Sequence, residues 1–349
     1  MKFPAVAMVA ALSCAAVSPC IHAQWWNPQD TNQPKDRGTQ WEKKPTYDHH
    51  IVEIAQGVIW QAIQSEDFAK IDRMYGEFMR DKIRNNEGIP MIDAFRRALS
   101  DLPNGKDEAE MRAFFAAWRE KSPGSRLLPI AEAEGWTGLA WHARGGGNYG
   151  EVTQEGRELF QQRLRQATRA LEASADVGKD DPLWYYVALV VAGASGRPDA
   201  QFDTLYDEAV TKFPTYLSLY YTRVNFLLPE WGGSWDKVDA LVQDAVKRTQ
   251  ATDGTSMYAR IYFNLASTRK GNVFEYSNAR WPAMRNSFED MLKRFPDPWN
   301  RQLYLSFSCL ARDKETTARL MSQNPGDQVF PWGNSLSTDG CRRFAFDRT

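Results

Sequence analysis

The chain has 349 residues and a formal net charge of −1, because 43 Lys and Arg residues nearly balance 44 Asp and Glu residues. A near-neutral chain without a dense basic run lacks the electrostatic footprint of a nucleic-acid-binding protein, so we expect no nucleic-acid partner. The length allows one or two ordinary domains or one extended array, and 13 Trp residues supply apolar material for a large core.

Residues 1–23 are predicted to be an export signal peptide. Lys2 supplies the positive start, residues 4–17 form an apolar run too short to span a bilayer, and Ala23 precedes the expected cleavage site. A loose lipid-attachment box ending at Cys14 makes a lipoprotein the alternative. Because no second long apolar run follows, the sequence predicts a mature protein without a transmembrane segment that is periplasmic or secreted.

The next two regions differ in their apolar patterning. Residues 24–48 are rich in Gln, Asn, Asp, Lys and Pro and show no apolar period, which predicts a flexible lead-in. Residues 49–121 have apolar side chains three and four positions apart, as in amphipathic helices, but they show no internal repeat. We predict an N-terminal helical region with a helix from Ile51 and further helices over 68–83, 91–99 and 108–118.

Residues 122–349 are predicted to form an array of helix pairs. Helix starts recur at Asp181, Thr215, Thr255 and Asp297, about 34, 40 and 42 residues apart. An Asp before a Pro is a favourable start because its carboxylate caps free N–H groups and Pro fits the first turn. With an earlier pair across residues 127–176, the pattern predicts an all-α fold of antiparallel helix pairs stacked as an α-solenoid.

Two of the second helices in these pairs end alike, with Phe-Pro at residues 213–214 and at 295–296. An aromatic residue, Tyr206 or Phe288, lies eight positions before each of these prolines. This pattern resembles the end of a tetratricopeptide helix pair. The resemblance implies a helical array that binds a peptide or protein partner along a concave face.

Two Gly-rich loops add a second resemblance. Residues 141–147 read Trp-His-Ala-Arg-Gly-Gly-Gly, and residues 228–234 read Leu-Pro-Glu-Trp-Gly-Gly-Ser. With Asp181-Pro182 between them and the helix from Trp281 after them, their order is similar to the bacterial family of domain of unknown function 4034. The resemblance covers roughly residues 127–320. It implies a helical domain and supplies no catalytic residues.

The mature sequence contains no recognisable catalytic or metal-binding motif. Its histidines are His49, His50 and His142 only, whereas a zinc site needs several His, Cys or carboxylate ligands at short fixed spacing. The glycines at 145–147 are not followed by the Gly-Lys-Ser/Thr that a phosphate-binding loop requires. We therefore expect no metal and no cofactor, and we assign no catalytic residue.

Cys309 and Cys341 are the two cysteines that remain once the signal peptide is removed. Two cysteines in an oxidising compartment predict one disulfide. The alternative is a pair of free thiols, with Cys309 buried in a helix.

Arg144, Tyr149, Glu230, Trp231 and Trp235 lie in or beside the two Gly-rich loops and form the predicted binding surface. An Arg with exposed aromatic side chains is the composition of an interaction hot spot. Both loops follow first helices of their pairs, so we expect them at one edge of the array. The alternative is that the Trp side chains fill gaps between helix pairs while Arg144 donates to helix-end carbonyls.

The function that the sequence favours is a non-enzymatic scaffold or adaptor for an unknown protein or peptide partner, an expectation based on fold analogy. The alternative is a hydrolase or lyase that uses carboxylates on a helical scaffold. That alternative requires paired acidic side chains in one deep pocket, with raised pKa values.

Overall fold

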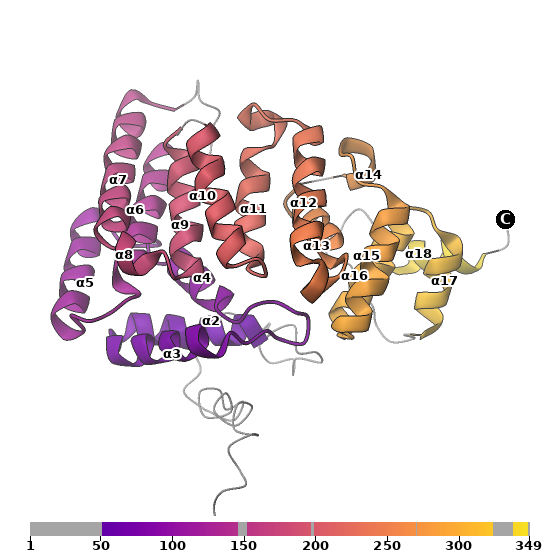
Figure 1. The fold of residues 1–349 in the computed structure, drawn as a ribbon, viewed down its shortest axis with the longest axis horizontal. Coiled ribbons are helices and arrows are strands. Elements are labelled where there is room, and N and C mark those ends of the chain that lie inside the picture. The colour runs from indigo at the N-terminus through magenta and orange to yellow at the C-terminus, as the bar shows by residue number, and fades with distance from the viewer. Residues whose placement is uncertain (1–50, 146–151, 197–198, 270, 324–337, 348–349) are drawn as a thin grey trace, which may run out of the picture.

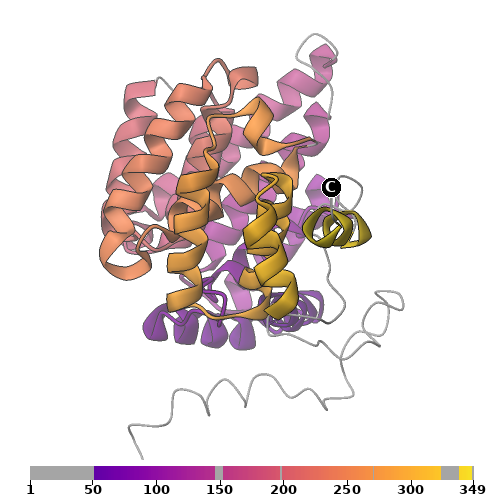
Figure 2. The same cartoon turned by 90° about the vertical axis from the view of Figure 1, so that its right-hand side faces the viewer.

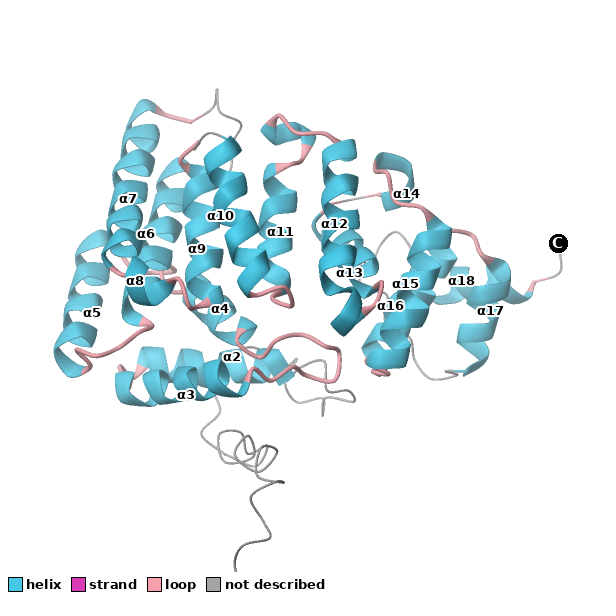
Figure 3. Cartoon of the chain, viewed as in Figure 1, coloured by secondary structure: helices cyan, strands magenta, loops and turns pink. Residues whose placement is uncertain are grey.

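A computed structural model describes residues 51–145, 152–196, 199–269, 271–323 and 338–347. Within these ranges the regular structure is helical (Figure 3), apart from one isolated bridge between Arg84 and Pro90. The all-α class predicted from the sequence is therefore confirmed. The predicted signal peptide, the lead-in and Tyr149 lie outside the described residues.

The N-terminal region contains α2 (Ile51–Gln64), α3 (Phe68–Asp81), α4 (Asp93–Ser100) and α5 (Glu108–Lys121). In Figure 1, α2 and α3 lie across the lower edge of the row formed by the later helices. The buried side chains of α3 recur at three and four positions, which explains why this segment forms an amphipathic helix against the core. A capping box between Asp107 and Glu110 fixes the start of α5.

The later helices stand side by side as successive pairs (Figure 1). The pairs are α6 (Leu128–Arg144) with α7 (Gln154–Ala173), α9 (Pro182–Ala194) with α10 (Asp199–Lys212), α11 (Leu217–Phe226) with α12 (Trp235–Asp253), α13 (Ser256–Thr268) with α15 (Trp281–Arg294), and α16 (Pro298–Leu310) with α17 (Lys314–Gln323). Short helices α8 (Ala175–Gly178), η3 (Pro229–Trp231) and α14 (Val273–Tyr276) lie in the connections. This arrangement is the helical array that the sequence periodicity predicts.

The Asp-Pro helix starts form as the sequence predicts. The carboxylate of Asp181 accepts hydrogen bonds from the backbone N–H groups of Leu183 and Trp184 at the start of α9. The carboxylate of Asp297 accepts from the N–H of Trp299 at the start of α16. Each carboxylate satisfies N–H groups that have no partner inside the helix.

The helix start predicted at Thr255 is confirmed and the one predicted at Thr215 is one residue early, but neither threonine caps its helix through its side chain. The residue before α11 is Tyr216 rather than Thr215, and it makes no side-chain cap. Thr255 does precede α13, but its hydroxyl donates to the carboxylate of Asp290 on α15 (2.8 Å) and does not cap the helix. The contact between neighbouring helices therefore outweighs the local preference of a Thr hydroxyl for the helix N-terminus.

One continuous apolar core runs from Val52 to Ala345 and includes both the N-terminal region and the array. Four first helices each contribute a fully buried tyrosine to it, namely Tyr185, Tyr220, Tyr262 and Tyr304. Each hydroxyl donates a hydrogen bond, to Glu208, the Pro214 carbonyl, Asp239 and Glu289 respectively. These bonds let the rings fill the core without leaving an unpaired polar group.

Helix α18 (Thr338–Phe346) packs against α17 and α16 at the C-terminal end of the array, the end that faces the viewer in Figure 2. A disulfide joins Cys341 on α18 to Cys309 on α16, with a Cα–Cα distance of 5.8 Å. Among the helices with assigned positions, none combines the length and apolar character needed to cross a bilayer.

Candidate functional site

The structure brings Arg144 and Trp231, two of the sequence-predicted binding residues, to one edge of the array. The Arg144 guanidinium lies 5.5 Å from the centre of the Trp141 ring, and the ring centroids of Trp141 and Trp231 are 6.4 Å apart. Trp141, which lies in the first Gly-rich signature, thus connects the two loops. Arg144 also donates to the carbonyl of Gly145 (3.1 Å), as the packing alternative expects.

The other predicted residues at this edge connect through Arg269. Arg269 forms an ion pair with Glu230, and its guanidinium lies 5.4 Å from the centre of the Trp235 ring. Trp231 packs against Phe226 and is 49% exposed. We refer to Trp141, Arg144, Glu230, Trp231, Trp235 and Arg269 as the edge cluster. Its side chains link the first pair (α6 and α7) to the third (α11 and α12) and the third to the fourth (α13 and α15), and leave the Trp231 ring partly open to solvent.

A second site, which the sequence interpretation missed, is a cavity of about 330 Å³. One side of the cavity is lined by α11, α13 and α16, which are first helices of successive pairs. The other side is lined by α2, α4 and the connection of residues 82–92 between α3 and α4, which we call the strap. This volume is within the usual range for ligand pockets, about 300–1,000 Å³.

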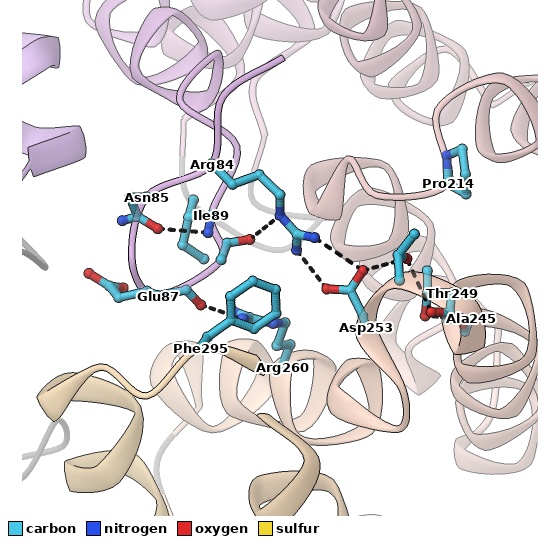
Figure 4. A network of polar contacts seen from close by, with 12 residues as sticks. Arg84, Asn85, Glu87, Ile89, Pro214, Ala245, Thr249, Asp253, Arg260 and Phe295 are labelled. Atoms are coloured by element: carbon cyan, nitrogen blue, oxygen red, sulfur yellow. Dashed lines mark hydrogen bonds and ion pairs between the residues drawn. The ribbon is translucent and has the colours of Figure 1, made fainter. Parts of the chain in front are cut away.

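The strap is attached to the array by a buried ion pair (Figure 4). Arg84 donates from Nη2 to Oδ1 of Asp253 (2.6 Å) and from Nη1 to Oδ2 (3.2 Å), and its Nε donates to the carbonyl of Gly88 (2.7 Å). The Thr252 hydroxyl also donates to Asp253, which is fully buried at the end of α12. One guanidinium therefore fixes both the turn of the strap and its position on the array.

The turn of the strap places a backbone carbonyl at the cavity wall. Asn85 accepts from the backbone N–H of Ile89 through Oδ1 (2.7 Å), and Gly88 adopts a φ of +85°. This turn directs the carbonyl of Glu87 to the array, where it accepts hydrogen bonds from Nη2 of Arg260 on α13 and from Nδ2 of Asn300 on α16. A side chain at Gly88 would approach the same Nη2 atom to 2.7 Å, so the close contact requires glycine.

Asp93, the first residue of α4, is saturated with donors on the cavity wall. Its carboxylate accepts from Arg96 (2.6 Å), Arg97 (3.1 Å) and the Ser218 hydroxyl on α11 (2.8 Å). Burial alone would raise the pKa of Asp93, but the two arginines and the hydrogen bonds outweigh it and hold the pKa well below its usual range. Asp93 is therefore ionised, paired with two arginines of its own helix and joined to the array through Ser218.

The carboxyl of Glu87, in contrast to that of Asp93, has a raised pKa. Burial, reinforced by the nearby charge of Asp297 and opposed by Arg260, raises the pKa of the Glu87 carboxyl to about 8. Its Oε1 atom is buried and has no hydrogen-bond partner in the described part of the chain. Glu87 is therefore mostly uncharged at neutral pH, because an ionised carboxylate there would be desolvated without compensation.

The cavity thus contains two acidic side chains whose pKa values are displaced in opposite directions, an arrangement also found in acid–base catalysis. Both oxygens of Asp93 already accept from arginines, however, so this carboxylate is not free to act on a substrate. The part of the chain with assigned positions contains no group of three or more potential metal ligands.

No family model matches the sequence, and neither a curated protein nor a solved structure matches it. The resemblance to the family of domain of unknown function 4034 therefore stays a prediction. The functional argument consequently depends on the cavity and the edge cluster themselves.

Proposed function

We propose that this chain is an exported scaffold or adaptor that binds an extended peptide segment of a partner protein in the cavity. The observation that carries the proposal is the position of the cavity on the first helices of three successive pairs. Arrays of this kind present continuous surfaces across neighbouring repeats, and such surfaces suit extended ligands. The disulfide between Cys309 and Cys341 supports an oxidising compartment.

The chemistry of the cavity lining also favours a peptide. The side-chain amide of Asn264 on α13 makes no hydrogen bond within the described ranges, and it offers both a donor and an acceptor. The peptide backbone presents the complementary pair of groups at every residue. Apolar side chains line the same cavity, including Ile89, Met291 and Leu303, and could receive the side chains of the bound segment.

A hydrolase is the second candidate, and Glu87 is the observation that favours it. A buried carboxyl with its pKa raised to about 8 could donate a proton at neutral pH. The other acidic residues of the lining, Glu53 and Asp93, both pair with arginines, Glu53 with Arg97 and Asp93 with Arg96 and Arg97. The residues that line the cavity therefore fit a binding site better than a catalytic site.

The test is affinity capture with the mature protein as bait, from the exported fraction of its own cells. Captured proteins are identified and then mapped on arrays of overlapping synthetic peptides. The decisive variant is Asn264→Trp, which places a large ring in the cavity at a residue with no side-chain hydrogen bond to lose. The matched control is Trp231→Ala, which removes the exposed ring of the edge cluster.

We expect peptides to bind the wild-type protein and Trp231→Ala but not a folded Asn264→Trp variant. Binding that is lost with Trp231→Ala and kept with Asn264→Trp would instead assign the interaction to the edge cluster. Failure of the wild-type protein to bind any peptide, together with hydrolysis that depends on Glu87, would replace the proposal with the hydrolase alternative.

A further inference from the structure

Arg260 is a buried arginine of the cavity wall whose guanidinium is only partly hydrogen-bonded. Its side chain lies on α13, faces the strap and is only 5% exposed. Its Nη2 donates to the Glu87 carbonyl, and its guanidinium lies 5.4 Å from the centre of the Phe295 ring. Its Nε atom is buried and donates to no atom of the described chain. No ion pair within the described ranges includes Arg260.

The other arginines near the cavity do not share this state. Arg84 pairs with Asp253, whereas Arg96 and Arg97 both pair with Asp93. Arg223 on α11 is the closest comparison, because it is 8% exposed and also lies over a ring, but it pairs with Asp203 at 2.5 Å. A buried charge without a counter-ion is costly, so an anion that enters the cavity would compensate Arg260.

The net charge of the cavity lining also favours an anion. The lining contains three arginines, whereas its acidic residues are Glu53, Asp93 and Glu87. Burial and the charges of Asp297 and Glu53 raise the pKa of Glu87 to about 8 against the opposing charges of Arg260 and Arg97, so its carboxyl is mostly uncharged at neutral pH. The lining therefore has a net positive charge near pH 7, and Arg260 is the arginine that no carboxylate neutralises.

The guanidinium of Arg260 is also held in a fixed orientation. The Glu87 carbonyl holds one of its nitrogens, and the Phe295 ring covers it. The Gly88 backbone lies so close that an added Cβ would be 2.7 Å from Nη2. A positioned planar fork of N–H groups matches the oxygens of a carboxylate or phosphoryl group and loses little entropy on binding.

We propose that Arg260 forms an oxyanion-binding subsite in the cavity, which receives a carboxylate or phosphoryl group of the bound ligand. This inference rests on the proposed function, because it identifies the group by which the ligand is anchored. The required chemistry is a pair of anionic oxygens. It could come from a carboxylate, either at a chain end or on an acidic side chain, or from a phosphoryl group. The experiment separates these sources.

The probes are succinate and inorganic phosphate, titrated separately into the intact mature protein at constant ionic strength with chloride as the reference anion. Binding is followed by thermal stabilisation and by the change in intrinsic tryptophan fluorescence, to which Trp299 in the cavity lining contributes. We expect a saturable effect of one or both anions on the wild-type protein. Arg260→Gln should weaken it by roughly 10- to 100-fold, whereas Arg223→Gln should leave it unchanged.

The pH dependence of succinate binding provides a second readout, one that a purely structural role of Arg260 would not produce. We expect affinity to fall as pH rises through about 8, because an ionised Glu87 would repel the anion. In Glu87→Gln the affinity should stay constant over that range. Equal pH profiles for the two proteins would contradict the assigned charge state of the cavity.

The wild-type titration decides the proposal even if Arg260→Gln fails to fold. Absence of any saturable effect of both anions beyond that of chloride would overturn the subsite. Anion binding without peptide capture would keep the subsite and reject the adaptor function. If peptide capture is unaffected by Arg260→Gln, and is also unaffected when every carboxylate and phosphate of the peptide is neutralised, the adaptor function stands and the subsite is rejected.

Discussion

A single buried carboxylate, Asp253, joins the strap to the array 169 residues away in sequence. Asp253→Asn would leave Arg84 partly buried without its counter-ion, and removal of one partner of a buried pair is strongly destabilising. We expect the free energy of unfolding to fall by about 3 kcal/mol in urea denaturation. Asp244→Asn on the same helix breaks the exposed pair with Arg248 and should cost less than about 1 kcal/mol.

Gly88 offers a second test of the strap. Gly88→Ala must adopt a φ of +85° and also places Cβ within 3 Å of both Arg260 and the Phe295 ring. Gly105→Ala is a matched control, because Gly105 has a φ of +74° but open space around it. We expect both variants to lose roughly 1 kcal/mol from backbone strain. Gly88→Ala alone should lose further free energy of unfolding, because its Cβ meets Arg260 and Phe295. Equal losses of the two variants in thermal denaturation would contradict this close contact.

Among the helices, α18 is joined covalently to α16 by the disulfide between Cys309 and Cys341 and also packs against α16 and α17. Closing a loop of 32 residues is expected to stabilise the folded state by about 3–4 kcal/mol relative to the reduced chain. Reduction should therefore lower the melting temperature. Hydrogen exchange should increase first in α18, and the Cys309→Ser/Cys341→Ser variant should behave in the same way. Unchanged exchange in α18 on reduction would show that packing alone holds it.

Helices whose starts depend on local contacts were predictable from the sequence. Asp181 and Asp297 cap their own helices, so the Asp-Pro pair at each start contains the whole signal. The recurrence of apolar residues likewise indicated most helices and the all-α class. Thr255 failed as a cap because its partner, Asp290, lies on another helix, and no local pattern records that contact.

The cavity could not be predicted for the same physical reason. Arg84, Asp93 and Arg260 come from three separate segments, and each resembles an ordinary surface charge in the sequence. Their role appears only when the strap lies on the array. The edge cluster was partly predictable, because Arg144 and Trp231 lie in two unusual Gly-rich loops, although the bridging contact through Trp141 was not anticipated.

At the scale of the whole molecule, buried acids within the described ranges contribute to the pH dependence of stability. Burial raises the pKa of Glu87 to about 8 and that of Glu134 to about 7. Between the ordinary carboxyl pKa and these values, the folded protein holds protons that the unfolded chain releases. Stability from these two groups is therefore greatest in mild acid and falls as pH rises toward 8.

We expect the free energy of unfolding to decrease between pH 5 and pH 8 by on the order of a few kcal/mol, as measured by urea denaturation. The variant Glu87→Gln/Glu134→Gln should show a much flatter profile over this range. Asp93 acts in the opposite direction, because its lowered pKa contributes stability that is lost only in stronger acid. Identical slopes for the wild-type protein and the double variant would contradict the burial of these acids.

The long-range attachment of the strap also sets an order of assembly during synthesis. The strap leaves the ribosome early, but its partners Asp253, Arg260 and Asn300 lie up to 213 residues further along the chain. Since chains emerge from the N-terminus, the strap remains without its partners while the array is still being made. The cavity is thus completed last, and a nascent chain that ends before α16 cannot offer it to a ligand.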